Sequence, residues 1–111
     1  MDILFKSRRL RELCHDDTIA TRTLGPHSAR KLRTRLDDLF ALAHLGLAHK
    51  LAGRFHALSR DRDGQFALDL HGGFRLAFEP AEPLRPTLPD GSLDLSRVTA
   101  IRIVYIGNYH D

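Results

Sequence analysis

The stretch QFALDLHGGFRLAFE, residues 65–79, decides the fold of this chain. Its two halves, 65–70 and 74–79, alternate apolar and polar side chains with a period of two, which is typical of half-buried β-strands. Between them, Gly72 and Gly73 readily take the positive φ that a tight hairpin turn needs. Residues 65–79 therefore predict a β-hairpin with one apolar face, formed by Phe66, Leu68, Leu70, Phe74, Leu76 and Phe78.

Further strands are predicted on both sides of this hairpin. Residues 54–58, RFHAL, read as a strand that precedes a polar turn at 59–64. Residues 98–106 predict a strand that is apolar on both faces, as expected of a central strand. Residues 3–5 predict a short first strand, whereas residues 80–97 hold four of the five prolines and predict an irregular excursion.

Two helices are predicted between the first strand and the hairpin. Ser7 is expected to cap a helix that carries Leu10, Leu13 and Cys14 on one side and ends at Gly25-Pro26. The second helix starts at about Pro26 or Ser28, with Arg30, Arg33, Arg35 and Asp37 outside its apolar stripe of Leu32, Leu36, Leu39, Phe40, Ala43 and Leu47. We therefore expect an α+β fold, in which an N-terminal strand and a two-helix hairpin pack on one face of a small, mostly antiparallel sheet.

Composition limits the class of protein. A chain of 111 residues with 42% hydrophobic residues predicts a single domain, residues 1–111, with a packed core. Its one cysteine, Cys14, forbids an internal disulfide and fits a reducing compartment. There is no apolar run of the ~20 residues that would span a bilayer, and the charges of the N-terminus follow its apolar stretch, unlike a signal peptide. We expect a soluble, cytoplasmic protein without a membrane partner.

The charge distribution allows a nucleic-acid partner. The formal net charge is +3, and residues 1–50 carry ten Lys and Arg against six Asp and Glu. Such an excess is compatible with nucleic acid or with an acidic protein. The planar guanidinium of the numerous arginines suits phosphate, although a GC-rich genome gives the same bias.

The face of the sheet opposite the helices is the predicted place of function, because no helix is left to cover it. Arg75 lies mid-strand and must point to solvent or to an anion, since an unpaired buried charge is costly. Either a phosphate contact or an ion pair with Asp69 or Glu79 would neutralise the charge of Arg75. Side-chain parity predicts that this face also carries Gln65, Asp69, His71 and Glu79, and the same rule applied to the other strands adds Arg54, His56 and Arg102.

The last residues of the chain carry two further proton-transfer groups. Tyr109 and His110 follow the predicted central strand, and histidine transfers protons near neutral pH; a plain surface tail is the alternative. The seven histidines lack the spacing of a metal site, and no phosphate-binding glycine loop or nucleophilic serine motif is present. We expect neither a metal nor a cofactor.

An ordered set of motifs resembles the HigB-type toxins of the RelE/ParE superfamily, in the branch called plasmid maintenance system killer proteins. The motifs are RFHAL at 54–58, DRDGQFALDL at 61–70, GFRLAFEP at 73–80 and IVYIGNYH at 103–110. The opening Phe5-Lys6-Ser7 and the helix hairpin around Gly25 are similar as well. The resemblance covers essentially the whole chain and implies a RelE-like fold.

The resemblance also implies a function. HigB-like proteins are toxins of type II toxin–antitoxin pairs, ribosome-dependent endoribonucleases that cleave translated messenger RNA without a metal. Their usual partner is a helix-turn-helix (HigA-like) antitoxin, through which operator DNA is bound. The implied catalytic residues are His56, Arg75, Tyr109 and His110.

Each implied residue suits a part of RNA cleavage by the 2′-hydroxyl. Arg75 would stabilise the phosphorane, His56 and His110 would act as acid and base, and Tyr109 would orient the nucleotide. The implied substrate-binding residues are Arg54, Arg60, Arg62 and Asn108, of which the arginines would hold the RNA backbone. Asn108 stands where the family has an acidic residue.

Two other functions remain open from the sequence. The same scaffold can serve as a non-enzymatic inhibitor, as in ParE-like relatives that poison DNA gyrase. It can also serve as a regulator that mainly supports antitoxin binding to DNA. The pair Tyr109-His110 favours the nuclease, because a pure binding protein would not need it.

Overall fold

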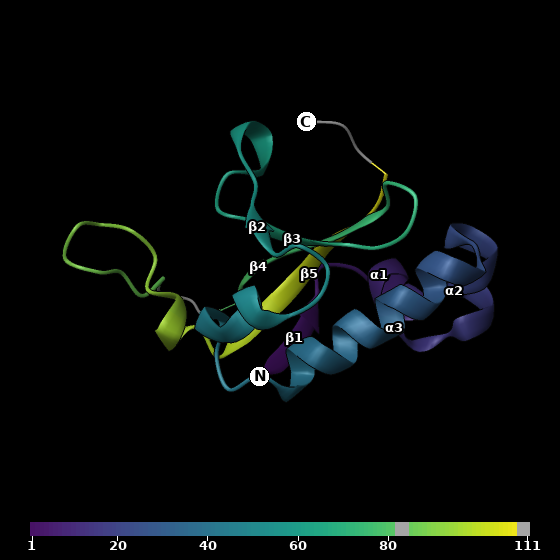
Figure 1. Ribbon diagram of the computed structural model, residues 1–111, viewed down its shortest axis with the longest axis horizontal. Coiled ribbons are helices and arrows are strands. Elements are labelled where there is room, and N and C mark those ends of the chain that lie inside the picture. The colour runs from purple at the N-terminus through teal and green to yellow at the C-terminus, as the bar shows by residue number, and fades with distance from the viewer. Residues whose placement is uncertain (82–84, 109–111) are drawn as a thin grey trace.

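A five-stranded sheet organises the molecule (Figure 1). The computed structural model describes residues 1–81 and 85–108. Within them the strand order is β1-β5-β4-β3-β2, and only the β1–β5 pair is parallel. The α+β class and the mostly antiparallel sheet are confirmed. The strands are β1 (Asp2–Phe5), β2 (His56–Ala57), β3 (Phe66–Asp69), β4 (Arg75–Pro80) and β5 (Ala100–Gly107).

The first predicted helix is in fact two helices, α1 (Arg8–His15) and α2 (Asp17–Leu24). Ser7 caps α1 as predicted, because its hydroxyl accepts the amide of Leu10 at 3.2 Å. The prediction of one continuous helix up to Gly25 was wrong. Asp16 has extended backbone angles, and its carboxylate accepts hydrogen bonds from the amides of Thr18 and Ile19 at 2.9 and 3.1 Å. An aspartate that caps the following helix interrupts the one before it.

The third helix, α3 (Pro26–Ala41), is shorter than predicted, and its apolar stripe is confirmed at Leu32 and Leu39. Gly25 takes φ +85° ahead of it, and Leu47 lies beyond it in a 3-10 helix, η1 (Leu45–Lys50). Phe40 was expected on the apolar stripe but is 68% exposed, whereas Arg35 was expected outside it but is buried. The buried positions follow a four-three-four spacing: Ser28, Leu32, Arg35 and Leu39. In the described residues, no helix combines the length and apolarity needed to cross a membrane.

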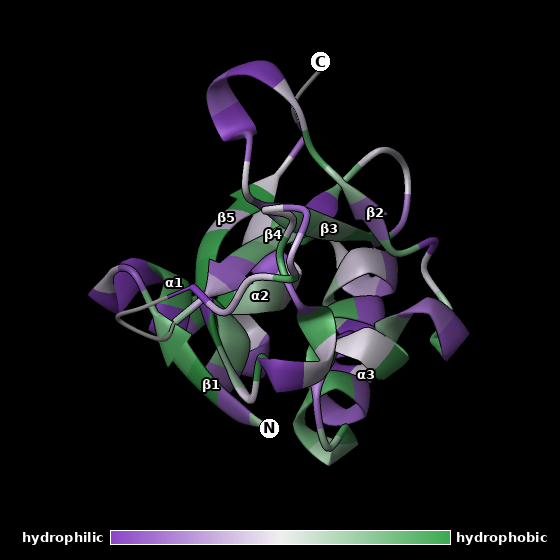
Figure 2. Ribbon diagram, turned by 90° about the vertical axis from the view of Figure 1, so that its left-hand side faces the viewer, coloured by the Kyte–Doolittle hydropathy of each residue, from purple (hydrophilic) through white to green (hydrophobic). Residues whose placement is uncertain are grey.

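The main core lies between the helices and one face of the sheet. Phe78 of β4 is fully buried, with its ring centroid 6.2 Å from that of Phe55 and 6.5 Å from that of Phe66. Figure 2 shows apolar residues along β5 and β1, where these strands meet the helices. The other members of this core come from α2, α3, η1, three strands and residues next to the strand ends: Leu24, Leu32, Leu39, Leu45, Ala48, Leu68, Leu70, Leu76, Val98, Ile101 and Ile103.

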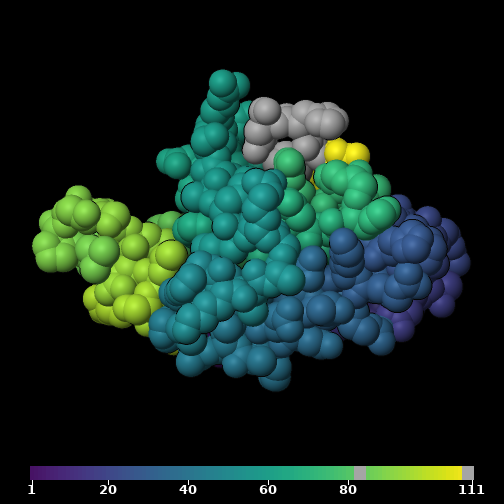
Figure 3. Space-filling view, in the orientation of Figure 1, coloured from purple at the N-terminus to yellow at the C-terminus, as the bar shows by residue number. Residues whose placement is uncertain are grey.

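Two irregular segments stand out from the surface (Figure 3). One contains a 3-10 turn, η2 (Arg60–Arg62), between β2 and β3. The other is an arm that folds back on itself through the Thr87–Leu93 bridge and returns to β5 through η3 (Leu95–Arg97). The predicted strand 54–58 is reduced to two residues, because Arg54 has φ +56°, outside the extended region.

One extra residue in β5 changes which side chains reach each face. Ala77 lies opposite Tyr105, but the next residue, Phe78, lies opposite Ile103, so Val104 forms a bulge. A bulge reverses the alternation of the strand that contains it. Tyr105 therefore lies on the face opposite the helices, although Ile103 faces the core.

Candidate functional site

Polar residues of three strands meet on the face of the sheet opposite the helices, called the far face below. Asp69 of β3 lies directly opposite Arg75 of β4, which lies opposite Gly107 of β5. His56 of β2 lies opposite Ala67, two residues before Asp69 on the same face. The parity predicted for Arg75, Asp69 and His56 is confirmed.

The centre of the far face is covered, contrary to the prediction of an uncovered polar surface. Ala67 and Ala77 are fully buried beneath Leu58, and Val104 and Tyr105 pack against the same cluster. The cover arises because the chain turns back after β2, where the Leu58 amide donates to the Gln65 carbonyl at 2.9 Å. The polar groups are thus divided into two areas, one around Asp69 and one at the Arg102–Glu79 ion pair, 3.1 Å.

Asp69 holds two arginines together on the far face. Arg54 donates to its carboxylate from Nε at 2.8 Å and from Nη2 at 3.2 Å, and the Arg75 Nε lies 3.4 Å from it. Burial alone would raise the pKa of this carboxyl. The hydrogen bond and charge of Arg54, with the charges of Arg75 and His56, outweigh burial and lower the pKa of Asp69 below its ordinary value. We call Arg54, Asp69 and Arg75 the Asp69 cluster.

The lowered pKa predicts how stability depends on pH. Because folded Asp69 binds a proton less readily than unfolded Asp69, its interactions stabilise the fold above the ordinary pKa of 3.8 and are lost as the pH falls through the lower folded value. Asp69→Asn should therefore reduce the free energy of unfolding by about 0.5–1 kcal/mol at pH 7, a modest effect since these groups are partly exposed. At pH 2–3 the difference from wild type should shrink.

Urea denaturation at both pH values measures this difference. Asp37→Asn, which changes an exposed carboxylate on α3, is the control. An equal loss for Asp69→Asn at both pH values would contradict the role assigned to the ionised carboxylate.

His56 is fixed in one tautomer by the backbone. Its Nδ1 lies 2.7 Å from the carbonyl oxygen of Arg54. A carbonyl only accepts, so Nδ1 carries the hydrogen and Nε2 is the basic nitrogen of the neutral ring. The positive φ of Arg54 turns this carbonyl toward His56 while its guanidinium reaches Asp69. His56 can thus accept a proton next to two arginines.

Tyr105 is a site residue that the sequence did not reveal. Its ring lies 4.3 Å from the guanidinium carbon of Arg62, which stacks on it. Its hydroxyl lies over Gly107, where an added Cβ would come within 2.6 Å of the phenol oxygen. Since Gly107 is the cross-strand neighbour of Arg75, the phenol extends toward the Asp69 cluster. Gly107 is the only sequence signal for the position of Tyr105. The bulge that turns Tyr105 to the far face does not show in the pattern of apolar and polar residues along β5.

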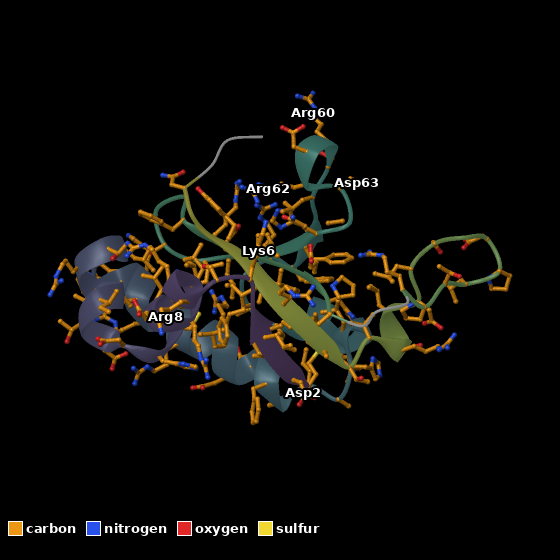
Figure 4. The ribbon with its side chains drawn as sticks, turned by 180° about the vertical axis from the view of Figure 1, so that it is seen from behind. Asp2, Lys6, Arg8, Arg60, Arg62 and Asp63 are labelled. Atoms are coloured by element: carbon orange, nitrogen blue, oxygen red, sulfur yellow. The ribbon has the colours of Figure 1, made fainter. Side chains whose placement is uncertain are left out.

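The remaining predicted residues occupy different surroundings. Arg62 donates to the side-chain oxygen of Gln65 at 3.3 Å besides stacking on Tyr105, so it covers the far face. Arg60 lies at the exposed tip of η2, and Figure 4 shows it pointing away from the sheet. Asn108 lies beside Gly73, whose Cβ would be 3.3 Å from the Asn108 side-chain oxygen. The predicted residues Tyr109 and His110 lie outside the described residues.

A broad groove lies away from these residues, between β1, α1 and α3. Its lining mixes apolar and charged side chains and includes none of the predicted site residues. Burial raises the pKa of the Cys14 thiol in this groove to about 12, so Cys14 is protonated and a poor nucleophile. In residues 1–81 and 85–108, no three His, Cys, Asp or Glu side chains are grouped to hold a metal.

The sheet order and the helices on one face together define a fold of the RelE/YoeB-like toxins. One structure of this kind is the YoeB–YefM complex from Staphylococcus aureus, with a TM-score of 0.58 and 13% identity, covering 99% of this chain and 98% of that one. Another is a YoeB/ParE toxin from Agrobacterium tumefaciens, with a TM-score of 0.58 and 8% identity, covering 99% and 100%. No family model and no curated protein sequence matches the chain. At these identities the likeness is one of fold, and the HigB branch stays a prediction.

Proposed function

We propose that this protein is the toxin of a type II toxin–antitoxin pair and that its domain, residues 1–111, cleaves messenger RNA on the translating ribosome without a metal. One observation carries the proposal: a histidine of fixed tautomer, His56, lies on the far face together with a half-buried arginine, Arg75, that is paired with Asp69. A base beside a fixed positive charge is the arrangement that RNA cleavage by an internal nucleophile requires.

The proposed reaction uses the 2′-hydroxyl of the RNA as nucleophile. His56 Nε2 takes the hydroxyl proton as the 2′-oxygen bonds to phosphorus, which gives a pentavalent phosphorane. The bond from phosphorus to the 5′-oxygen then breaks, and an acid protonates that oxygen; we assign the acid to His110 and the orientation of the nucleotide to Tyr109. The products are a 2′,3′-cyclic phosphate and a 5′-hydroxyl end.

The charge of the Asp69 cluster supports an anionic substrate. Two guanidinium groups and one carboxylate leave the cluster with one net positive charge at neutral pH, on a partly exposed surface. We assign the phosphorane contact to Arg75 and contacts with the RNA backbone to Arg54, Arg60, Arg62 and Asn108. Arg60 suits this role by its exposure at the tip of η2.

The partner we propose is an antitoxin. The Staphylococcus aureus structure is a complex of YoeB with YefM, and the motifs of this chain resemble toxins that pair with helix-turn-helix, HigA-like antitoxins. Operator DNA would be bound only through that antitoxin. Ribosomes and messenger RNA as targets place the protein in the cytoplasm.

A reconstituted translation reaction tests the proposal. Purified wild-type protein is added, 5′ ends of the messenger are mapped, and a ribosome-free reaction and His110→Ala serve as controls. We expect cuts only with ribosomes and wild-type protein. Intact messenger in the presence of folded protein would overturn the nuclease assignment, and an assay of DNA gyrase would then test the inhibitor function.

A further inference from the structure

Arg35 of α3 is buried on the helical side of the sheet. It is 8% exposed, and in the described residues it is the only buried side chain that carries a charge. Burial of a guanidinium is costly unless its donors are used. Its Nε donates to the backbone carbonyl of Asp69 at 3.1 Å. Asp69, whose carboxylate binds Arg54 and Arg75 on the far face, therefore also binds a third arginine through its backbone carbonyl.

Gly53 lies against both Asp69 and Arg35. Its carbonyl accepts the Asp69 amide at 2.6 Å, so both backbone groups of Asp69 are held at one point of the fold. Gly53 has φ +107°, and an added Cβ would lie 2.5 Å from the Arg35 Nε. Only glycine leaves room for the guanidinium here.

The chain that follows Gly53 leads directly into the candidate site. The next residue, Arg54, binds the Asp69 carboxylate, and its carbonyl sets the tautomer of His56. A shift of Arg35 would therefore move Asp69 and the segment that carries Arg54 and His56 together. Two predicted site residues, Arg54 and His56, are thus connected through Asp69 and Gly53 to one contact made from α3.

We propose that Arg35 is a positioning residue, which acts through the Asp69 carbonyl and the Gly53 loop to align the Asp69 cluster and His56. The inference rests on the proposed function for what the aligned groups do, but the alignment itself can be measured without any activity.

The test compares Arg35→Met, which keeps the length and removes the donors, with Ser28→Ala. Ser28 is the matched control because it is also buried on α3 and also binds hairpin backbone, donating to the His71 carbonyl at 2.9 Å and accepting its amide at 3.1 Å. The first readout is the ¹H–¹⁵N signal of the Arg54 Nε–H group, with the signals of Arg102 as internal reference. We expect the Arg54 signal to move in Arg35→Met and to stay in Ser28→Ala, with the Arg102 signals unchanged in both.

Cleavage on ribosomes is the second readout. Arg35→Met should lower kcat by about 10-fold or more with little change in KM, since a small displacement of catalytic groups is costly, and Arg35→Lys should recover part of it. A folded Arg35→Met with the wild-type Arg54 signal overturns the proposal. If Arg35→Met does not fold, Gly53→Ala decides in the same way, because its Cβ displaces the guanidinium. If wild type cleaves no messenger, the proposed function fails, while the spectra still decide the role of Arg35.

Discussion

Arg75→Ala should abolish the growth inhibition expected of the proposed toxin and should lower the proposed ribosome-dependent cleavage by about 10²- to 10³-fold, the loss typical when one group that stabilises a charged transition state is removed. Arg75 is half-buried beside Asp69, so its charge is only partly screened by water. Its removal leaves Asp69 with Arg54 alone, and the cluster then carries no net positive charge.

Arg102→Ala is a closely matched control. Arg102 is an arginine of the same sheet face, is similarly exposed, and is paired with the Glu79 carboxylate at 3.1 Å. It lies beyond the buried patch formed by Leu58 and the two alanines, away from His56. We expect Arg102→Ala to keep toxicity. Equal loss in both variants, with both folded by circular dichroism, would indicate a general electrostatic effect and would contradict a specific role for Arg75.

The residues that sequence analysis placed well are those governed by local alternation. The large apolar residues of the β3–β4 hairpin lie at alternate positions, and Gly72 and Gly73 take the predicted positive φ at its turn. Parity follows from this alternation, so Asp69 and Arg75 could be placed on one face. The α+β class followed from the same periods.

The residues that sequence analysis misplaced depend on distant partners. Arg35 was expected to be exposed because of its charge, although it lies at helical spacing from Leu32 and Leu39. Its partners are a carbonyl 34 residues away and the space above Gly53. Tyr105 reaches the site only because Val104 bulges from β5. Leu58 covers the far face because of how the chain returns to β3. None of these non-local contacts leaves a periodic signal. The burial of Arg35 and the covering of the far face could therefore not be predicted, whereas Leu32 and Leu39 are buried as predicted.

His56→Ala should lower ribosome-dependent cleavage by about 10²- to 10⁴-fold, the usual range for loss of a general base. The structure supports this because the Arg54 carbonyl holds Nδ1 at 2.7 Å, which leaves Nε2 to take the proton of the 2′-hydroxyl.

His49→Ala separates this role from the mere presence of an imidazole. His49 is also held by a backbone carbonyl, with its Nδ1 2.9 Å from the oxygen of Gly46, but it lies in η1, away from the Asp69 cluster. We expect His49→Ala to cleave messenger as wild type does. If His56→Ala also cleaved messenger as wild type does, while Arg75→Ala did not, the base would have to be another group, and His56 would be left with the structural role of joining β2 to the segment after Gly53.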